Sequence, residues 1–277
     1  MVTKAARVWE WIRRRNPGRV YWVYRSFIWH AALHDLRHRY TGSAIGIFWN
    51  VLIPLAQILI YTAVFSAIMP VRLPGVMVSH PFTIYLCSGL LPWLGFSECV
   101  TRGTSCFLEN ANYLKKLSIP EQVFVAQNAV VATLSLFISM ALLFGLTMIL
   151  GARITWTWLS VLPVVLLFQS LGFGLGLTLG SLNVFFRDVG QVLGVTLQMW
   201  MWLTPIVYIE ELVPPGLQKF MILNPAFPFV NALHAAIVRG EWPEPSRWAW
   251  MLGWAIATPF VGYLILRKVR PEIRDTL

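Results

Sequence analysis

Residues 122–150 read QVFVAQNAVVATLSLFISMALLFGLTMIL, a run without a single charged side chain. About 20 consecutive apolar residues in a helix are enough to cross the hydrocarbon core of a bilayer, which is about 30 Å thick. Runs of this length and purity are typical of membrane spans rather than of soluble core helices. The stretch therefore predicts a membrane-spanning helix over Gln122–Leu150, and it sets the class of the whole protein.

The rest of the chain repeats this pattern. We expect five more spans, at Ala44–Met69, Pro81–Thr101, Trp158–Leu182, Val189–Tyr208 and Trp248–Leu266. The 277 residues are 57% hydrophobic and only 12% charged, whereas soluble domains carry about 25% charged residues. The predicted fold is an all-α membrane protein with six transmembrane helices, in a single domain that covers residues 1–277.

Basic residues are unevenly shared between the two sides of this bundle. Seventeen Lys and Arg residues fall on the side that holds both termini, and five fall on the other side. Cytoplasmic loops carry an excess of basic residues. We predict an inner-membrane protein, and this distribution places residues 1–43 and 268–277 in the cytoplasm and the bundle at 44–267 in the membrane. The net charge of +10 then faces the anionic inner leaflet, which argues against nucleic-acid binding.

Two stretches outside the spans have patterns of their own. Arg19 to Tyr40 combines aromatic, apolar and basic residues, which predicts an amphipathic helix in the cytoplasmic membrane interface. Between the fifth and sixth spans, Leu217–Leu223 and Ala226–Val238 are apolar but too short to cross a bilayer. Because Asn224-Pro225 between them favours a turn, we expect a periplasmic re-entrant helix pair. Two helices lying on the membrane surface are the alternative.

The sequence lacks the motifs of an enzyme. It has no Gly-x-x-x-x-Gly-Lys-Ser/Thr loop, so we do not expect the chain to bind ATP by itself. We predict no catalytic residue: Glu210 and Glu211 are adjacent, but nothing near them resembles a base or a nucleophile. A membrane enzyme acting on lipid-linked sugars is the alternative, and its only candidate residues on the periplasmic side are Glu210, Glu211, Glu241, Glu244 and His234.

Several polar or small residues have structural interpretations. His30, His34 and His38 form one helical stripe without a cysteine or carboxylate at ligand spacing, so we predict a titratable surface and no metal site. The four glycines between Gly172 and Gly180 indicate close helix packing rather than phosphate binding. Glu98 and Arg102 lie one helical turn apart and are expected to form an ion pair.

The loop after the second span is the most informative cytoplasmic feature. Residues 109–120 read ENANYLKKLSIP, which predicts a short polar helix with a few apolar side chains, ended by proline. A segment of this kind can seat in a groove on a partner protein.

Four segments together resemble the permeases of the type-2 ABC exporters, specifically those that export O-antigen and teichoic-acid polysaccharides. LRHRYTGSAIGIFW at 36–49 resembles the start of the family's first span, and residues 110–120 resemble its coupling loop. NVFFRDV at 183–189 with WLTPIVY at 202–208 resembles the signature of the fourth and fifth spans. Asn224-Pro225 with Pro228-Phe229 resembles the periplasmic gate segment.

The resemblance implies a homodimer of permeases above two ATP-binding cassette subunits, moving a polyprenyl-pyrophosphate-linked glycan outward among membrane lipids. ATP and Mg would bind the partner subunits, and this chain would bind no cofactor. The residues implied in ATPase coupling are Asn110, Asn112, Tyr113, Leu114, Lys115, Lys116 and Leu117. Those implied at the lipid pyrophosphate are Arg37 and Arg39, and those implied in channel lining are Trp93, Phe96, Trp200 and Trp202. Those implied in the periplasmic gate are Asn224, Pro225, Pro228 and Phe229. A teichoic-acid or capsule glycan, another lipid or a drug is the alternative cargo.

Overall fold

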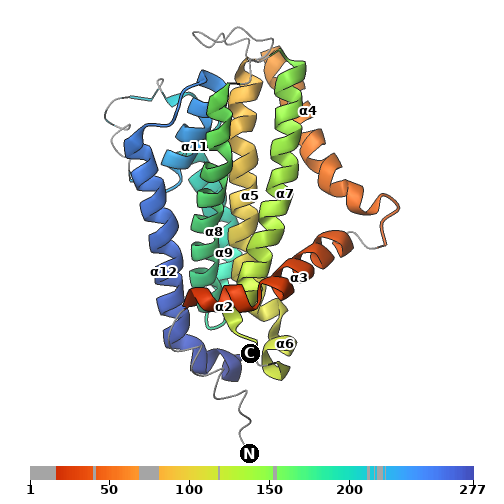
Figure 1. Cartoon of the computed structure of the whole chain (residues 1–277), viewed down its shortest axis with the longest axis vertical. Helices are drawn as coiled ribbons and strands as arrows, with labels where there is room; N and C mark the ends of the chain where they lie inside the picture. Colours follow the sequence, from red (N-terminus) through yellow and green to blue (C-terminus); the bar gives the residue numbers. More distant parts are fainter. Residues whose placement is uncertain are drawn as a thin grey trace, which may run out of the picture.

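The computed structural model describes residues 17–39, 42–68, 81–117, 119–151, 155–210 and 223–277, together with residues 213, 214, 216 and 221. All regular elements within these ranges are helical, and the ranges contain no strand. Figure 1 shows most of the long helices running side by side as one bundle, with short helices gathered at its two ends. The predicted all-α class is confirmed.

Four helices form the body of the bundle. They are α5 (Pro81–Glu109), α7 (Glu121–Ile149), α8 (Val161–Asn183) and α12 (Pro245–Thr276). Helix α5 lies between α7 and α8, and α12 packs along α8. Most side chains of α5 are buried, so this helix forms the centre of the hydrophobic core.

Glycines allow the helices of this body to touch through their backbones. A methyl group on Gly180 of α8 would lie 2.5 Å from the carbonyl oxygen of Gly103 on α5. A methyl group on Gly103 would lie 2.7 Å from the Cα of Gly176, and one on Gly262 of α12 would lie 2.8 Å from the carbonyl oxygen of Gly174. Small residues permit such close approach between membrane helices. The packing interpretation of the α8 glycines is therefore confirmed.

A proline in α12 is compensated by a neighbouring helix. Pro259 has no backbone N–H, so the carbonyl oxygen of Ala255 loses its partner within the helix. The Ser170 hydroxyl on α8 donates a hydrogen bond of 2.8 Å to that oxygen. In a membrane interior such a replacement matters, because water cannot take the place of the lost donor.

Four helices of the described part are long and apolar enough to cross a membrane, and they cover Gly46–Val64, Glu121–Ile149, Trp156–Asn183 and Pro245–Ile273. These helices correspond to the predicted first, third, fourth and sixth spans. The first comprises the short turn η1 (Gly46–Phe48) and α4 (Trp49–Ile68), and the fourth begins with η2 (Trp156–Ser160) before α8.

The other two predicted spans correspond to α5 and to α9 (Asp188–Leu203). We expected the fifth span to continue to Tyr208, but α9 ends at Leu203 and Thr204 is extended. Pro205 explains the early end, because proline lacks an amide donor and disfavours helical geometry in the residue before it. The 16 residues of α9 extend about 24 Å, less than the thickness of a bilayer core.

The predicted interfacial helix over Arg19 to Tyr40 is two helices, α2 (Pro17–Val23) and α3 (Arg25–His38). Tyr24 between them departs from helical geometry, with φ −94° and ψ 9°. Both helices pack on α7: Val20 and Ile28 lie against Val123, and Ala32 and Leu36 lie against Val131. In Figure 1, α2 and α3 cross the lower end of the bundle, at an angle to the long helices.

Candidate coupling and conduction sites

The predicted coupling loop contains a short helix, α6 (Ala111–Lys116), between α5 and α7. Asn110 begins it: the Asn110 carbonyl accepts hydrogen bonds of 3.0 Å from the amides of Tyr113 and Leu114. The Asn110 side chain donates a 2.9 Å bond back to the Cys106 carbonyl, which ties the turn to α5. The sequence prediction of a helix in this loop is confirmed.

Leu114 is the one buried side chain of α6, with no exposed surface. It packs in a cluster with Phe107 of α5, Phe124 of α7 and Ile273 of α12. Leu114 therefore anchors the segment on the bundle and does not face a partner, contrary to its implied role as a contact. The remaining predicted contacts, which are exposed, are Asn112, Tyr113, Lys115, Lys116 and Leu117.

These exposed side chains form a mixed surface. Tyr113 and Leu117 supply apolar area, with exposed fractions of 59% and 43%. Lys115 and Lys116 lie in the last turn of α6, where positive charge complements the partial negative charge of a helix C-terminus. A tyrosine and a leucine beside two lysines fit a groove that is apolar inside and acidic at its rim.

Two ion pairs join α3 and the residue directly after it to α5. Arg39 lies 2.8 Å from the Glu98 carboxylate, and Arg102 pairs with Asp35. Arg102 also donates a 3.2 Å hydrogen bond to Asn128 on α7. The predicted pair between Glu98 and Arg102 is thus wrong, because α3 brings an opposite charge to each of them.

Arg37 and Arg39 differ in their surroundings. Both are exposed, but Arg39 is in addition held at Glu98 by an ion pair. Arg39 and Glu98 also line a small cavity of about 190 Å³ between α4, α5 and α7, with Asn50, Gln57 and Ser135 on its walls. Pro54, which also lines this cavity, lies inside α4 and removes the helical partner of the Asn50 carbonyl.

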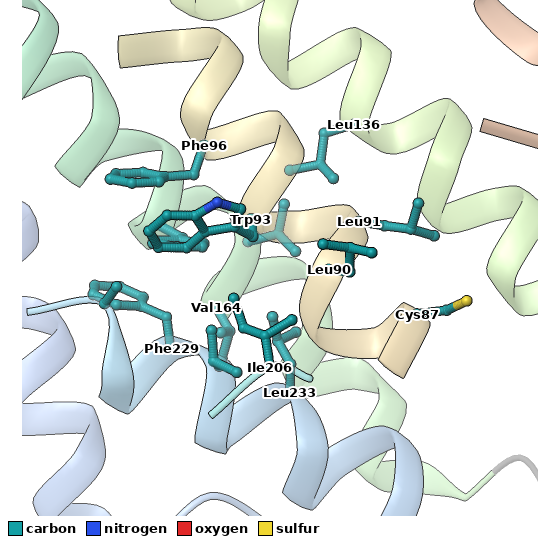
Figure 2. Close-up of a cluster of buried hydrophobic side chains, with 14 of the residues drawn as sticks. Cys87, Leu90, Leu91, Trp93, Phe96, Leu136, Val164, Ile206, Phe229 and Leu233 are labelled. Carbon is teal, nitrogen blue, oxygen red and sulfur yellow. The ribbon is translucent and has the colours of Figure 1, made fainter. Parts of the chain in front are cut away.

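Three of the four predicted lining residues belong to a buried aromatic cluster. Phe96 stacks on Phe168 with ring centroids 4.5 Å apart, and Phe168 stacks on Phe229 at 4.9 Å. Trp200 meets Trp93 and Phe96 edge-on at 5.6 and 5.5 Å. Figure 2 shows Trp93 and Phe96 on α5 directed toward Phe229. Phe96 has no exposed surface, so within a single copy of the chain it lies behind the surface of the bundle.

A groove of about 520 Å³ lies on the surface between α4, α5 and α9. Trp93 and Trp202 are the predicted residues that line it, and Trp202 is 55% exposed. Its other notable lining residues, which were not predicted from the sequence, are Tyr61, Ser97, Thr101 and Gln198. Polar side chains inside apolar runs were the available signal, because membrane helices direct such residues away from lipid.

Asn224 fixes the start of the predicted gate segment. Its side-chain oxygen accepts bonds of 2.7 Å from the Trp200 indole and 3.0 Å from the Ala226 amide. Its side-chain nitrogen donates a 2.8 Å bond to the Thr204 hydroxyl. Asn224 therefore joins the end of α9 to the following helix, while Pro225 belongs to the turn between them.

That following helix is α11 (Phe227–His234), continued by a π-helical turn, η4 (Ala235–Arg239). Pro228 lies in its first turn, and Phe229 is completely buried. Helix α11 packs against α5, α8 and α12, so the second half of the predicted re-entrant pair is enclosed by protein. Most of the first half, Leu217–Leu223, lies outside the described residues.

The residues proposed for the alternative enzyme each contact a different group. Glu210 accepts a 2.6 Å hydrogen bond from Asn231, and Glu241 pairs with Arg239 at 3.4 Å. Glu244 accepts from Ser246, and His234 is buried beside the Tyr85 ring, with centroids 3.9 Å apart. Glu211 lies outside the described residues. The described arrangement offers structural roles for these groups.

The amino-acid sequence of the chain matches a protein family and several named relatives. Residues 28–238 match the family model described as "ABC-2 type transporter". The chain is 30% identical over 258 residues to the O-antigen export system permease protein RfbA of Myxococcus xanthus, which covers 92% of this chain and 96% of the relative. The RfbA permease of Klebsiella pneumoniae is 28% identical over 192 residues, covering 69% and 72% of the two chains. The polysialic acid transport protein KpsM of Escherichia coli is 23% identical over 250 residues, covering 87% and 92%.

The family model covers most of α3, all of α6 and α11, and the groove between α4, α5 and α9. The resemblance to type-2 ABC exporters is thereby confirmed. The chain belongs to the ABC-2 type transporter family, and it is a multi-pass membrane permease subunit that pairs with an ATP-binding subunit and has no catalytic activity of its own.

Proposed function

We propose that this chain is the permease of an exporter that moves a lipid-linked polysaccharide across the bacterial inner membrane, driven by ATP hydrolysis on a separate subunit. The observation that carries the proposal is the 30% identity, over 92% of the chain, to an O-antigen export permease. The groove chemistry supports it. Flat indole rings such as Trp93 and Trp202 suit the C–H faces of sugars, and Ser97 and Gln198 suit their hydroxyls.

The proposed architecture has six spans, with α5 and α9 as the second and fifth, both termini in the cytoplasm and one domain over residues 1–277. Helix α5 has 29 residues and is enclosed by its neighbours, so it is long enough to cross although Glu98 and Arg102 lower its hydropathy. Helices α2 and α3 lie in the cytoplasmic interface. The segment Asn224–Val238 dips into the outer leaflet and returns.

The proposed assembly is a homodimer above two ATP-binding subunits, which bind ATP and Mg. In each copy, α6 docks on an ATP-binding subunit through Asn112, Tyr113, Lys115, Lys116 and Leu117. The two grooves face each other and form the path of the glycan, with the α11 segment as its periplasmic gate.

The proposed pyrophosphate contact is made by Arg37 and Arg39 beside the end of α3. Arginine forms short, charge-assisted hydrogen bonds to phosphate oxygens. Arg37 is exposed and is the first to meet the headgroup, whereas Arg39 exchanges its Glu98 partner for it.

A capsule glycan is the second candidate cargo. The observation that favours it is the 23% identity, over 87% of the chain, to a polysialic acid transport protein.

The test uses the permease and its ATP-binding subunit reconstituted together in vesicles that contain polyprenyl-pyrophosphate-linked O-antigen. We expect ATP-dependent appearance of the glycan on the opposite face, detected by a glycan-specific antibody. Arg37→Glu should slow this export, while Arg267→Glu, which changes an exposed arginine on α12, serves as the matched control. Export by the permease alone, or no export of either O-antigen or capsule glycolipid by the full complex, would contradict the proposal.

A further inference from the structure

Arg270, near the cytoplasmic end of α12, makes the most deeply buried ion pair of the described residues. Its Nε atom lies 2.7 Å from a carboxylate oxygen of Glu121, and a second guanidinium nitrogen donates to the Gln122 side chain. The Glu121 side chain has no exposed surface and that of Arg270 is 16% exposed, whereas the carboxylates of the other described pairs are 21% exposed or more. A buried carboxylate is strongly destabilising without its counter-charge. The two elements that carry these charges are therefore held together.

The position of Glu121 in the chain connects this ion pair to the loop that carries α6. Glu121 and Gln122 are the first residues of α7, directly after Pro120 at the end of the loop that carries α6. One turn after Arg270, Ile273 packs in the same cluster as Leu114, and neither has exposed surface. A single stretch of α12 thus holds the loop at its end, through Glu121, and at its middle, through Leu114.

The interfacial helix α2 reaches the same place. Its Tyr21 meets Phe173 of α8 edge-on, with centroids 5.9 Å apart. Burial raises the pKa of the Tyr21 hydroxyl, Tyr263 of α12 adds to the rise, and the charge of Arg270 opposes it. Tyr21 therefore lies within electrostatic range of Arg270. In Figure 1, α2, α6 and the end of α12 gather at the lower end of the bundle.

We propose that Arg270 is a positioning residue for energy coupling, which holds the α6 loop on α12 through Glu121. A displacement of α6 by the ATP-binding subunit then moves α12, and with it α8, instead of bending the loop alone. This inference rests on the proposed function of α6 as the docking segment. It adds the residue that connects that segment to the far side of the bundle, 148 positions along the chain from Gln122.

The experiment removes both charges together, in the variant Glu121→Gln/Arg270→Gln, so that no buried carboxylate is left unpaired. The complex with the ATP-binding subunit is purified and reconstituted, and two quantities are measured: the amount of complex recovered and the glycolipid exported per ATP hydrolysed. We expect normal recovery and a fall in export per ATP of about fivefold or more, the low end of coupling between two sites. The single variant Arg270→Lys keeps the charge beside Glu121, so it should retain most of the wild-type export per ATP.

Lys268→Gln is the matched control, because Lys268 is an exposed cation in the same part of α12. The inference is overturned if the double variant assembles normally with an unchanged export ratio. It is also overturned if the double variant and Arg270→Lys are both lost from the membrane, since the pair would then serve folding alone. Failure of the proposed function would look different, because the wild-type complex itself would then export no glycan.

Discussion

Leu114 and Leu117 lie three residues apart, and the structure gives them opposite roles. Leu114 is completely buried and is the only buried side chain of α6, whereas Leu117 is 43% exposed. Truncating a buried leucine to alanine costs about 2–5 kcal/mol. We expect the lower part of that range, about 2–3 kcal/mol, because a six-residue helix at the surface relaxes readily into the space. For Leu117→Ala the expected cost is within about 0.5 kcal/mol.

Native cysteine provides the assay. Cys106 packs in the same cluster as Leu114 and has no exposed surface, so its thiol is shielded while α6 is in place. In detergent, Leu114→Ala should lower the melting temperature and speed the reaction of Cys106 with a fluorogenic maleimide, whereas Leu117→Ala should change neither. Leu117→Asp should leave the melting curve unchanged and weaken capture of the ATP-binding subunit.

Equal maleimide reactivity in Leu114→Ala and Leu117→Ala would contradict this prediction, since burial would then not distinguish the two positions. Normal capture of the ATP-binding subunit by Leu117→Asp would separately refute the assignment of the exposed face. Cys87 and Cys99 are also buried, with exposed fractions of 0% and 1%, and they react only when the bundle itself opens.

Three further predictions concern the bundle. Gly180→Val should destabilise the protein by about 1–3 kcal/mol, because its side chain would collide with the Gly103 backbone; Gly253→Ala, at an open position of α12, is the control, and equal melting temperatures would contradict the prediction. Ser170→Ala should cost about 1–3 kcal/mol by leaving the Ala255 carbonyl unsatisfied, and a second change, Pro259→Ala, should recover part of that loss by returning an amide donor; no recovery in thermal unfolding would count against this account. Cysteines at Lys116 and Trp242, both exposed, should react with an impermeant maleimide from opposite sides of the membrane, and labelling of both from one side would exclude the proposed orientation.

The sequence was most informative where a local pattern decides the structure. An uncharged run such as 122–150 has few alternatives to a membrane helix, and α7 covers Glu121–Ile149. The helix in the coupling loop followed from residues within one turn of each other. The glycines of α8 were interpreted correctly because close backbone approach needs small residues wherever the partner helix lies.

Distant partners explain most of the errors. Glu98 and Arg102 have the spacing of an ion pair, but Arg39 and Asp35 arrive from a helix about sixty residues earlier and pair with them instead. Leu114 and Leu117 both stand beside polar residues in the sequence, and the cluster of Phe107, Phe124 and the distant Ile273 decides that Leu114 is buried. Spacing along a helix identifies which residues share a face, and it does not identify what covers that face.

The direct backbone contact between α8 and α12 limits how these helices can move relative to each other. At Gly174 and Gly262 no layer of side chains separates the two backbones, so rotation or sliding of one helix would drive main-chain atoms into each other. The same holds for α8 and α5 at Gly180 and Gly103. We therefore expect these three helices to shift together, and α4 and α9 form the other walls of the groove beside α5.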